Sequence, residues 1–596
     1  MLTRMIVRNF KRLRDVEIPL GQAVVFLGPN NSGKTTALQA LALWDIGLRA
    51  WLAERGGKAS PEKRPGVAIN RRDLIALPVP AANLLWSDLH VRERVRESKE
   101  RRTRNIRIDV IVEGETAGTA WSCGLEFDYT SDEAFVCRPV RLPGYEVKSV
   151  QESKFTEIPE IFLQKEKEAE PGRSPRPRIC YLPPMSGLAA VEPKIEPGRV
   201  DVLLGEGQTA QVLRNLCYAV FDTKPAAWTA ICAEMQALFH ITLRKPEYIP
   251  QRGEILMAYE EHGKPLDISS AGRGAQQTLL LLAYLYANPG AVLLLDEPDA
   301  HLEILRQRQI YNRLVQLAAS QGSQIIAASH SEVVLNEAVG RDTVVAFVGK
   351  PHELAAGQPS QVLKSLRDIG FDQYYQAEEK GWVLYLEDTT DLPILRAFAD
   401  TLGHEARGVL DTPFVHYVGT NLRQRARDHF FGLREAKADL AGVALFDRLD
   451  RQLQVHPDLV ELAWRRREIE NYFCTREVLL RYAALPGGSE EGPLFEQAAK
   501  PRRIEAMEAA IAEIERALAS LGEASPWSPD IKATDRFLDP LFASYSKRLG
   551  MPLCLRKSMY SQLATLMPRE QIDAEVAEKL DAIMVVARRA RTSAEG

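Results

Sequence analysis

The first 55 residues carry an apolar pattern that predicts strand, loop and helix in that order. Residues 1–27 alternate between apolar and polar side chains and then run apolar, which predicts two strands. A glycine-rich segment follows, and residues 37–55 show the periodicity of a helix. Two later apolar runs, residues 292–295 and 325–328, predict further buried strands. This order of elements indicates an α/β fold.

The segment between these runs is patterned differently. Residues 106–140 alternate as strands do, and residues 206–240 have a helical pattern. Between them, residues 166–178 are rich in proline and charge, which indicates a surface loop. We therefore predict a first domain over residues 1–350 that carries an insertion at about residues 51–205.

The second half of the chain predicts a separate body. Residues 351–380 have the pattern of a connector, and a new strand–helix pattern fills residues 381–475. Residues 476–596 are mostly helical in pattern. The expected architecture is thus an α/β domain with an insertion, a second α/β domain and a helical C-terminal region.

The 596-residue chain has an ordinary globular composition, with 45% hydrophobic and 26% charged residues. Its net charge of −4 gives no global signal for nucleic acid, so such binding would need local basic patches. The seven cysteines form no CxxC pair, which disfavours structural zinc. The N-terminus lacks an apolar signal core, and the longest apolar run, residues 279–287, is too short to span a bilayer. We expect a cytoplasmic protein with no membrane partner.

The strongest chemical signal is the glycine-rich segment after the first strands. Gly28-Pro-Asn-Asn-Ser-Gly33-Lys34-Thr35 fits the P-loop pattern GxxxxGK[ST]. Its glycines let backbone N–H groups approach phosphates, Lys34 would neutralise the β- and γ-phosphates, and the Thr35 hydroxyl would bind Mg²⁺. The sequence therefore predicts ATP and Mg²⁺ as cofactors. The expected nucleotide-binding residues are Gly28, Asn30, Asn31, Gly33, Lys34, Thr35 and Thr36.

Two acids close the apolar run at residues 292–295. Asp296 would hold Mg²⁺, and Glu297 would orient and deprotonate the attacking water. An isolated Asp-Glu pair after a strand is more often a solvated strand end. Together with the P-loop, it predicts the catalytic end of an ATPase site.

The order of motifs resembles an ABC-type ATPase head. Ser269-Ser-Ala-Gly272-Arg-Gly274 precedes a predicted helix and resembles the ABC signature, although it departs from the common LSGGQ. In such heads a serine and glycines, here Ser270 and Gly272, meet the γ-phosphate bound by the opposite subunit. His330 likewise resembles the switch histidine that senses this phosphate. The resemblance implies a homodimer, or a higher homo-oligomer, formed through the heads.

Two features of the sequence indicate which branch of the ABC-type ATPases it resembles. About 230 residues separate Lys34 from the signature, yet they contain no sustained heptads, which disfavours the SMC and Rad50 branch. The opening Ile6-Val-Arg-Asn-Phe-Lys-Arg-Leu resembles the first strand of RecF-like and OLD-family (overcoming lysogenisation defect) ATPases.

The second α/β domain separates these two families. Glu387 and Asp447 each follow an apolar strand, and the pair resembles a Toprim domain, in which such acids converge on Mg²⁺ at the edge of a sheet. The resemblance implies catalytic roles for Glu387 and Asp447 and, by a looser OLD-family analogy, for Lys557. The implied metal ligands are Glu387, Asp391, Asp447 and Asp450, to which the segment around Glu468 and Glu470 could add a carboxylate.

The second domain also departs from the Toprim pattern. Asp388 stands where a glycine is usual, and Leu449 stands where the second acid of DxD is expected, so two-metal chemistry depends on Asp450. Two basic segments are candidates for contacting nucleic acid. The alternative for residues 91–107 is a solvated helix or loop, and the alternative for residues 464–467 is that Arg466 or Arg467 pairs with Glu468 or Glu470.

The resemblance to OLD proteins implies an ATP-hydrolysing, Mg²⁺-dependent DNA endonuclease, with Mn²⁺ as the alternative metal at the nuclease site. It further implies a role in bacterial anti-phage defence, where a second defence-system protein can be the partner. One alternative is an ATPase sensor or scaffold whose degenerate Toprim-like domain binds a partner, as in PARIS-like systems. Another is a RecF-like DNA-repair ATPase, which lacks a second acidic site.

Overall fold

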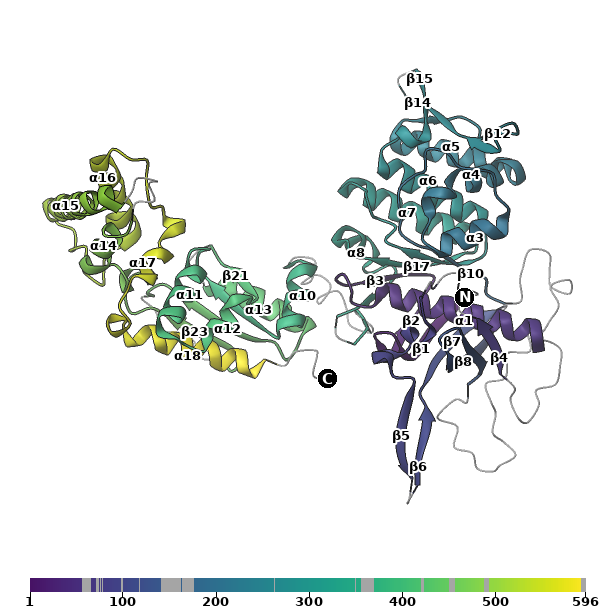
Figure 1. Cartoon of the computed structure of the whole chain (residues 1–596), viewed down its shortest axis with the longest axis horizontal. Helices are drawn as coiled ribbons and strands as arrows, with labels where there is room; N and C mark the ends of the chain where they lie inside the picture. Colours follow the sequence, from purple (N-terminus) through teal and green to yellow (C-terminus); the bar gives the residue numbers. More distant parts are fainter. Residues whose placement is uncertain are drawn as a thin grey trace. The chain divides into compact units, whose positions relative to one another are not determined.

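A computed structural model shows two compact units, Met1–Leu363 and Lys364–Gly596 (Figure 1). Each unit is described by itself below. The structure describes residues 1–590 except 56–65, 71–73, 75–76, 78, 98–99, 117, 141–161, 163–175, 262, 349, 355–368, 420–422, 450–455 and 487–492.

The first unit is built around helix α1 (Lys34–Arg55), which follows the glycine-rich segment. The helix is apolar around most of its circumference, a pattern typical of a helix buried on all sides. Its core includes Phe26 from one sheet and Val110 from another, so α1 is enclosed between the two. Trp44 in the middle of α1 donates a hydrogen bond to the carbonyl oxygen of Cys123 (2.8 Å).

One of these sheets is mainly parallel, with the strand order β10-β16-β17-β3-β18-β19. Its strands are continuously apolar because both faces are covered. The last strand alone is antiparallel. The bounds are β10 (Ile179–Leu182), β16 (Val292–Asp296), β17 (Gln324–Ser329), β3 (Ala23–Leu27), β18 (Thr343–Ala346) and β19 (His352–Glu353).

The other sheet is antiparallel, with the order β2-β1-β7-β8-β9-β4. The segment predicted as an insertion thus supplies four strands to this sheet and β10 to the parallel one. Alternation predicted strands there, but their pairing with the N-terminal strand β1 is a long-range contact that a local pattern does not carry. The bounds are β2 (Leu13–Pro19), β1 (Leu2–Phe10), β7 (Arg107–Thr116), β8 (Thr119–Ser131), β9 (Ala134–Pro139) and β4 (Val67–Asn70).

The basic segment at residues 91–107 contains an antiparallel hairpin of β5 (Arg92–Glu97) and β6 (Glu100–Asn105). It projects from the first unit as a two-stranded arm (Figure 1). The alternative of a solvated helix or loop is wrong for β5 and β6, because the two segments pair with each other as antiparallel strands.

A helical lobe completes the first unit around its own apolar core. Helix α6 lies in its centre, and its residues from Ala275 to Leu285 are buried. The lobe's helices are α3 (Pro197–Gly205), α4 (Leu213–Thr223), α5 (Pro225–Phe239), α6 (Arg273–Ala287) and α7 (Ile304–Ser320). Shorter elements of the unit are β11 (Thr242–Leu243), β12 (Glu247–Ile249), β13 (Glu254–Leu256), β14 (Ala258–Glu261), β15 (Lys264–Asp267) and α8 (Glu332–Ala338).

The second unit contains a four-stranded parallel sheet in the order β21-β20-β22-β23. Its strands are β21 (Val415–Tyr417), β20 (Trp382–Leu386), β22 (Ala441–Phe446) and β23 (Leu459–Ala463). Its helices are α10 (Phe371–Lys380), α11 (Asp391–Leu402), α12 (Ala406–Asp411), α13 (Arg423–Ala436), α14 (Arg476–Ala483), α15 (Pro493–Ser520), α16 (Asp539–Leu549), α17 (Ser561–Thr565) and α18 (Ala574–Arg589).

The helical C-terminal region and this sheet share one apolar core. Leu384 on β20, Ile394 on α11 and Leu563 on α17 belong to the same buried cluster. The residues predicted as a connector divide between the units, since β19 pairs within the first and α10 lies in the second. Residues 355–368 of that predicted connector lie outside the described residues.

Candidate functional site

The P-loop lies between β3 and α1, at the carboxyl edge of the parallel sheet. A Cβ atom on Gly28 (φ 156°) would lie 2.7 Å from the carbonyl oxygen of Phe347, so only glycine fits there. Gly33 has φ 108°, and Asn31 has φ 65°, a left-handed conformation that asparagine tolerates. These positions turn the backbone so that the loop leads directly into the N-terminus of α1, as anion-binding loops do.

Lys34 is buried beneath this loop, with 6% of its surface exposed. Its Nζ donates hydrogen bonds to the carbonyl oxygens of Gly28 and Pro29, both at 2.7 Å. Burial lowers the pKa of Lys34, while the nearby charges of Glu297 and Asp296 act in the opposite direction. The loop therefore holds a cation at the point where a bound phosphate chain would need one.

Asp296, at the end of β16, has both carboxylate oxygens oriented by hydroxyl groups. Thr35 donates to one oxygen (3.1 Å) and Tyr181 donates to the other (3.2 Å). Burial raises the pKa of Asp296 to about 6, although the two hydrogen bonds oppose this shift. Tyr181 was not predicted; it lies on β10, which pairs with β16, and only that pairing brings the phenol to the acid.

Glu297 follows Asp296 in a strained backbone conformation (φ 50°). Its N–H donates to the carbonyl oxygen of Ala328 on β17 (2.9 Å), which fixes the direction of its side chain. His330 follows β17, and its Nδ1 lies 3.9 Å from a Glu297 carboxylate oxygen. The structure thus brings the predicted base and the predicted switch histidine together at the same sheet edge as Lys34.

The segment that resembles an ABC signature precedes α6 and is exposed. Ser270 and Gly272 face open space, since a Cβ on Gly272 would meet no atom within 4 Å. The Gln276 side chain holds the segment from behind by donating to three of its carbonyl oxygens, those of Ile268 (3.1 Å), Ser269 (3.2 Å) and Ala271 (2.9 Å). The segment is therefore presented outward on a rigid support.

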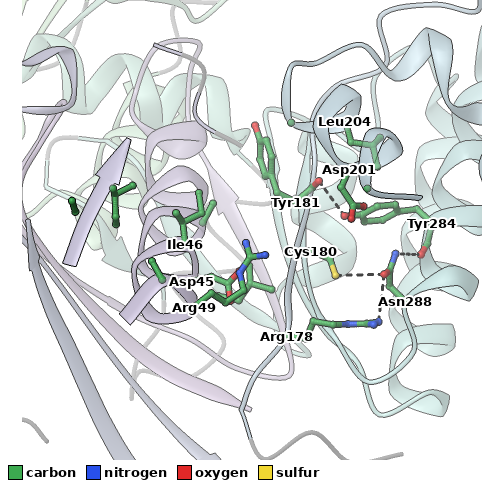
Figure 2. A pocket seen from close by; sticks show the side chains of 17 residues that line it. Asp45, Ile46, Arg49, Arg178, Cys180, Tyr181, Asp201, Leu204, Tyr284 and Asn288 are labelled. Carbon is green, nitrogen blue, oxygen red and sulfur yellow. Dashed lines mark hydrogen bonds and ion pairs between the residues drawn. The ribbon is translucent and has the colours of Figure 1, made fainter. Parts of the chain in front are cut away.

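A cavity of about 590 Å³ lies between α1, β10, α3 and the end of α6 (Figure 2). Arg49 pairs with Asp45 on its α1 side (2.9 Å), and the Cys180 thiol lies 3.5 Å from the Asn288 side-chain oxygen on its other side. Tyr181 also lines this cavity, so the wall of the cavity is connected to Asp296.

A second group of acids gathers at the carboxyl edge of the β20–β22 sheet. Glu387 directly follows β20 and Asp447 directly follows the neighbouring parallel strand β22. Neighbouring strands lie about 4.8 Å apart, so the two acids lie side by side. We define the acid edge as Glu387, Asp391, Asp447, Glu468 and Glu470.

The charges of the acid edge interact strongly. Burial, followed by repulsion from Glu387 and Glu470, raises the pKa of Asp447 to about 9. Burial and the charge of Glu468 raise the pKa of Glu470 to about 8, and burial is the main cause that raises the pKa of Asp391 to about 6. In the described part of the chain, the buried Oε2 of Glu387 has no hydrogen-bond partner.

Two lysines from the helical C-terminal region lie at this edge. Lys557, which was predicted, donates to the Asp388 carboxylate at 2.7 Å and holds the pKa of that acid below its usual range. Lys532, which was not predicted, lies 3.9 Å from a Glu468 carboxylate oxygen, and its charge also acts on Glu387. Nothing in the local sequence marks Lys532, because the fold brings it to the edge from a distant segment.

The remaining predicted residues fall elsewhere. Asp450 lies outside the described residues, so its prediction is not tested. The expected pairing of Arg466 with Glu468 or Glu470 is wrong: Arg466 pairs with Asp573 (2.9 Å), because α18 packs beside this segment. Across the described ranges, no group of three or more His, Cys, Asp or Glu side chains is already arranged to hold a metal ion.

Comparisons with known proteins bear on the first unit. Residues 1–44 match a family model described as an AAA ATPase domain. Residues 234–336 match one described as "AAA domain, putative AbiEii toxin, Type IV TA system". The chain is also similar to an OLD nuclease of Thermus scotoductus, with 49% identity over 43 residues, which are 7% of this chain and 8% of that protein.

Solved structures with some likeness are heads of SMC proteins. An SMC head bound to the C-terminal winged-helix domain of ScpA has a TM-score of 0.33 at 14% identity, covering 60% of this chain and 98% of that one. The SMC head of Thermotoga maritima has a TM-score of 0.30 at 13% identity, covering 60% and 99%.

No helix in the described part of the chain is long and apolar enough to cross a membrane. The fold is α/β, and the family-model matches fall within Met1–Leu363, where the P-loop, Asp296 and Glu297 share one sheet edge. The first unit thus contains two segments that match AAA ATPase domains, which supports ATPase activity, and the chain has a short stretch similar to an OLD nuclease.

Proposed function

We propose that this protein is an ATP-hydrolysing enzyme that also cleaves nucleic acid with the help of a divalent metal. The observation that supports the nuclease most is the acid edge. There Glu387 and Asp447 follow adjacent parallel strands, and repulsion among the acids helps to raise the pKa of Asp447 to about 9. Such a concentration of buried carboxylates is costly unless a cation balances their charge, and acids with strongly shifted pKa values often mark functional sites.

ATP hydrolysis would take place at the edge of the parallel sheet. Lys34 and the loop N–H groups hold the phosphates, Thr35 and Asp296 hold Mg²⁺, and Glu297 takes a proton from the attacking water. His330, 3.9 Å from Glu297, senses the γ-phosphate and orients Glu297. Asn30, Asn31 and Thr36 complete the contacts with the nucleotide.

The exposed signature segment supports assembly through the heads. Ser270 and Gly272 face away from their own lobe on a support fixed by Gln276, so they are free to complete the ATP site of a second copy. We propose a homodimer in which each ATP lies between the P-loop of one copy and the signature of the other.

The acid edge carries the carboxylate oxygens that Mg²⁺ and Mn²⁺ prefer, and its side chains would rearrange around one or two such ions. Two observations support this: the buried Oε2 of Glu387 has no hydrogen-bond partner among the described residues, and the pKa of Asp447 is raised to about 9. Glu387, Asp391 and Asp447 would hold the metal, and Asp450 remains a proposed ligand. A bound metal would supply Lewis-acid activation of the phosphate and of a water molecule.

The lysines at the acid edge fit the same chemistry. Cleavage of a phosphodiester places extra negative charge on the phosphate oxygens, and a lysine at the edge stabilises that charge. Lys557 is the residue that the OLD resemblance assigns to this role. Double-stranded DNA is the proposed substrate, with RNA as the second to be assayed.

The test is cleavage of circular DNA and of a labelled RNA by the purified full-length protein, with Mg²⁺, with Mn²⁺ and with a chelator. We expect cleavage with metal only, and its loss in Glu387→Gln and Asp447→Asn. Both variants should hydrolyse ATP within about threefold of wild type, because the acid edge and the P-loop occupy different units. Equal cleavage by wild type and both variants would overturn the assignment.

One observation favours a second candidate, a partner-binding unit that does not cut. Asp388 stands where Toprim sites carry glycine, and it engages Lys557 at 2.7 Å. In that case the ATPase would act as a sensor or scaffold, and the same assay would show no cleavage with any metal. A role in anti-phage defence, with or without a second protein, remains a proposal from the OLD resemblance and is tested by phage plating with and without the intact P-loop.

A further inference from the structure

The two lysines of the acid edge are held in different ways. Lys557, at the start of a short 3-10 turn (η8, Lys557–Met559), forms a direct 2.7 Å ion pair with Asp388. Among the described residues, the contacts of Lys532 are long, 3.5 Å to Asp535 and 3.9 Å to Glu468, and its side chain is 52% exposed. Lys557 is therefore engaged by an acid of its own unit, whereas Lys532 is the more available cation.

The backbone that carries Lys532 is fixed to the acid edge itself. Glu468 accepts a hydrogen bond from the N–H of Thr534 (3.1 Å), two residues after Lys532. The Asn471 amide donates to the carbonyl oxygen of Ile531 (3.1 Å), the residue before Lys532. Glu468 and Asn471 also bond each other's backbone in a reciprocal cap. Both sides of Lys532 are thus fastened to the segment that carries Glu468 and Glu470.

The local geometry at Lys532 is unusual as well. A π-helical turn, η7 (Ala533–Leu538), begins directly after it. Turns of this kind are rare and occur often at functional sites, because the widened turn re-aims the residues beside it. Here the turn follows the fastened segment, so the direction of Lys532 is set by the fold even though its side chain reaches into solvent.

We infer that Lys532 is the residue that binds the substrate phosphate at the acid edge, and that Asp388 withholds Lys557 from this role. The inference rests on the proposed function, since it takes the backbone phosphate of a nucleic acid as the ligand. Lys532 Nζ donates to a non-bridging phosphate oxygen and offsets the repulsion between that phosphate and the carboxylates around it.

The charges at Glu387 agree with this division. Among the charged groups that act on Glu387, Lys532 has the largest influence, ahead of Glu468 and Lys557. The charge of Lys532 thus acts on the acid that the proposed function places on the metal. A phosphate bound both by a metal on Glu387 and by a lysine would require the metal and the lysine to lie close together.

The experiment measures binding of a short fluorescein-labelled DNA duplex to the full-length protein by anisotropy, with Ca²⁺ replacing Mg²⁺ so that cleavage does not intervene. Lys532→Gln should weaken binding about tenfold, the loss typical of a charge-assisted hydrogen bond, and Lys532→Arg should keep most of the affinity. The slope of log affinity against log salt should also fall by about 1 in Lys532→Gln, as for one lost phosphate contact.

Lys547→Gln is the matched control, because Lys547 is an exposed lysine on α16 of the same unit. Lys557→Gln should weaken binding less than Lys532→Gln does. Adding Asp388→Asn to Lys532→Gln should restore part of the affinity, and only while Lys557 is present. Unchanged melting temperatures would show that these exposed substitutions leave the fold intact.

Identical affinity and salt slope in Lys532→Gln and Lys547→Gln would overturn the inference, and so would a wild-type protein that does not bind the duplex. Cleavage in Mg²⁺ separates the two proposals. A wild type that binds through Lys532 but cuts nothing removes the nuclease and leaves Lys532 as a phosphate-binding residue. A wild type that cuts, with Lys532→Gln cutting and binding equally well, removes Lys532 and leaves the nuclease.

Discussion

Both units place acids at the carboxyl edge of a parallel sheet, but the two edges differ in how their charge is balanced. We call the sheet edge that carries Lys34, Asp296 and Glu297 the ATP edge. There a hydroxyl group donates to each carboxylate oxygen of Asp296, and Lys34 is buried nearby. At the acid edge, Glu387 keeps a partnerless oxygen, and the lysines lie at the rim with their side chains 44% and 52% exposed.

The consequence is visible in the titration of the two edges. The pKa of Asp296 rises to about 6, whereas that of Asp447 rises to about 9. Both are raised first by burial, but Asp447 has several acids around it and Asp296 is bonded by two hydroxyls. The carboxylate of Asp296 is thus balanced by neighbouring donors, whereas the charge of the acid edge is balanced less completely.

The largest effect should come from removing the buried cation of the ATP edge. Lys34→Ala should lower ATP affinity at least about a hundredfold, because it removes the buried cation that would face the phosphates. Isothermal titration with a non-hydrolysable ATP analogue measures this. Lys11→Ala is the control, since Lys11 is also a lysine of the first unit and bonds Gln39 instead of the loop. Tight nucleotide binding by Lys34→Ala would show that the loop binds phosphate without its lysine.

Glu297→Gln should separate binding from hydrolysis at the same edge. The amide keeps the size of the side chain but cannot take a proton, so turnover should fall about a hundredfold or more while ATP affinity stays within a few-fold. Phosphate release and nucleotide titration give the two numbers. Comparable turnover in wild type and Glu297→Gln would exclude Glu297 as the base.

The stability of the second unit should fall as pH rises, because the pKa of Asp447 is raised by folding. A carboxylate whose pKa is lowered by folding has the opposite effect. The folded pKa of Asp447, about 9, lies above its unfolded value of 3.8. Its stabilising contribution is therefore complete below about pH 4 and is lost as pH rises through about 9. Melting temperature without metal should fall between pH 6 and pH 9, and Mg²⁺ should restore it by binding the deprotonated acids.

Asp447→Asn removes this titration, so we expect it to raise the metal-free melting temperature at pH 9 by a few degrees, since about 1 kcal/mol shifts a unit of this size by roughly 2–4 °C. Asp428→Asn is the control, because Asp428 is exposed on α13. A metal-free melting temperature that is flat from pH 6 to pH 9 in wild type would show that the acids are balanced without a metal.

The smallest effect should come from Tyr181. Tyr181→Phe removes one of the two hydroxyls on Asp296 and should raise the Mg²⁺ concentration needed for half-maximal ATP hydrolysis about threefold to tenfold, with a smaller change in maximal rate. Tyr129→Phe is the matched control, since the half-buried Tyr129 also donates to an aspartate, Asp132. An equal Mg²⁺ requirement in both variants would leave Tyr181 without a role at the metal.

The sequence predicts more of the ATP edge than of the acid edge. The reason is that local sequence shows consecutive residues but does not show contacts between distant segments. The P-loop could be predicted because its pattern lies in consecutive residues, 28–36, whose backbone geometry is the feature expected to bind phosphate. Asp296 and Glu297 follow one apolar strand and were found by the same logic. Tyr181 was missed because a phenol on a short strand has no local signature, and only the pairing of β10 with β16 brings it to Asp296.

The acid edge could be predicted only in outline. The apolar strands that precede Glu387 and Asp447 predict two acids at one sheet edge. The role of Lys557 is predicted from the OLD-family resemblance alone. Lys532 could not be predicted, because its position depends on how Glu468 and Asn471 fasten a segment some 60 residues away. The pairing of residues 107–116 with the N-terminal strand escaped prediction for the same reason.

The most direct measurement is calorimetric titration of Mn²⁺ into the full-length Lys34→Ala protein without nucleotide, repeated in Asp447→Asn, in buffers of different ionisation enthalpy. Without nucleotide, the ATP edge offers no complete metal site, so binding reports the acid edge. We predict one or two ions bound per chain, release of protons at pH 7 because the pKa of Asp447 is about 9, and loss of binding in Asp447→Asn. Absence of Mn²⁺ binding, or equal binding by Asp447→Asn, would contradict a metal-dependent acid edge.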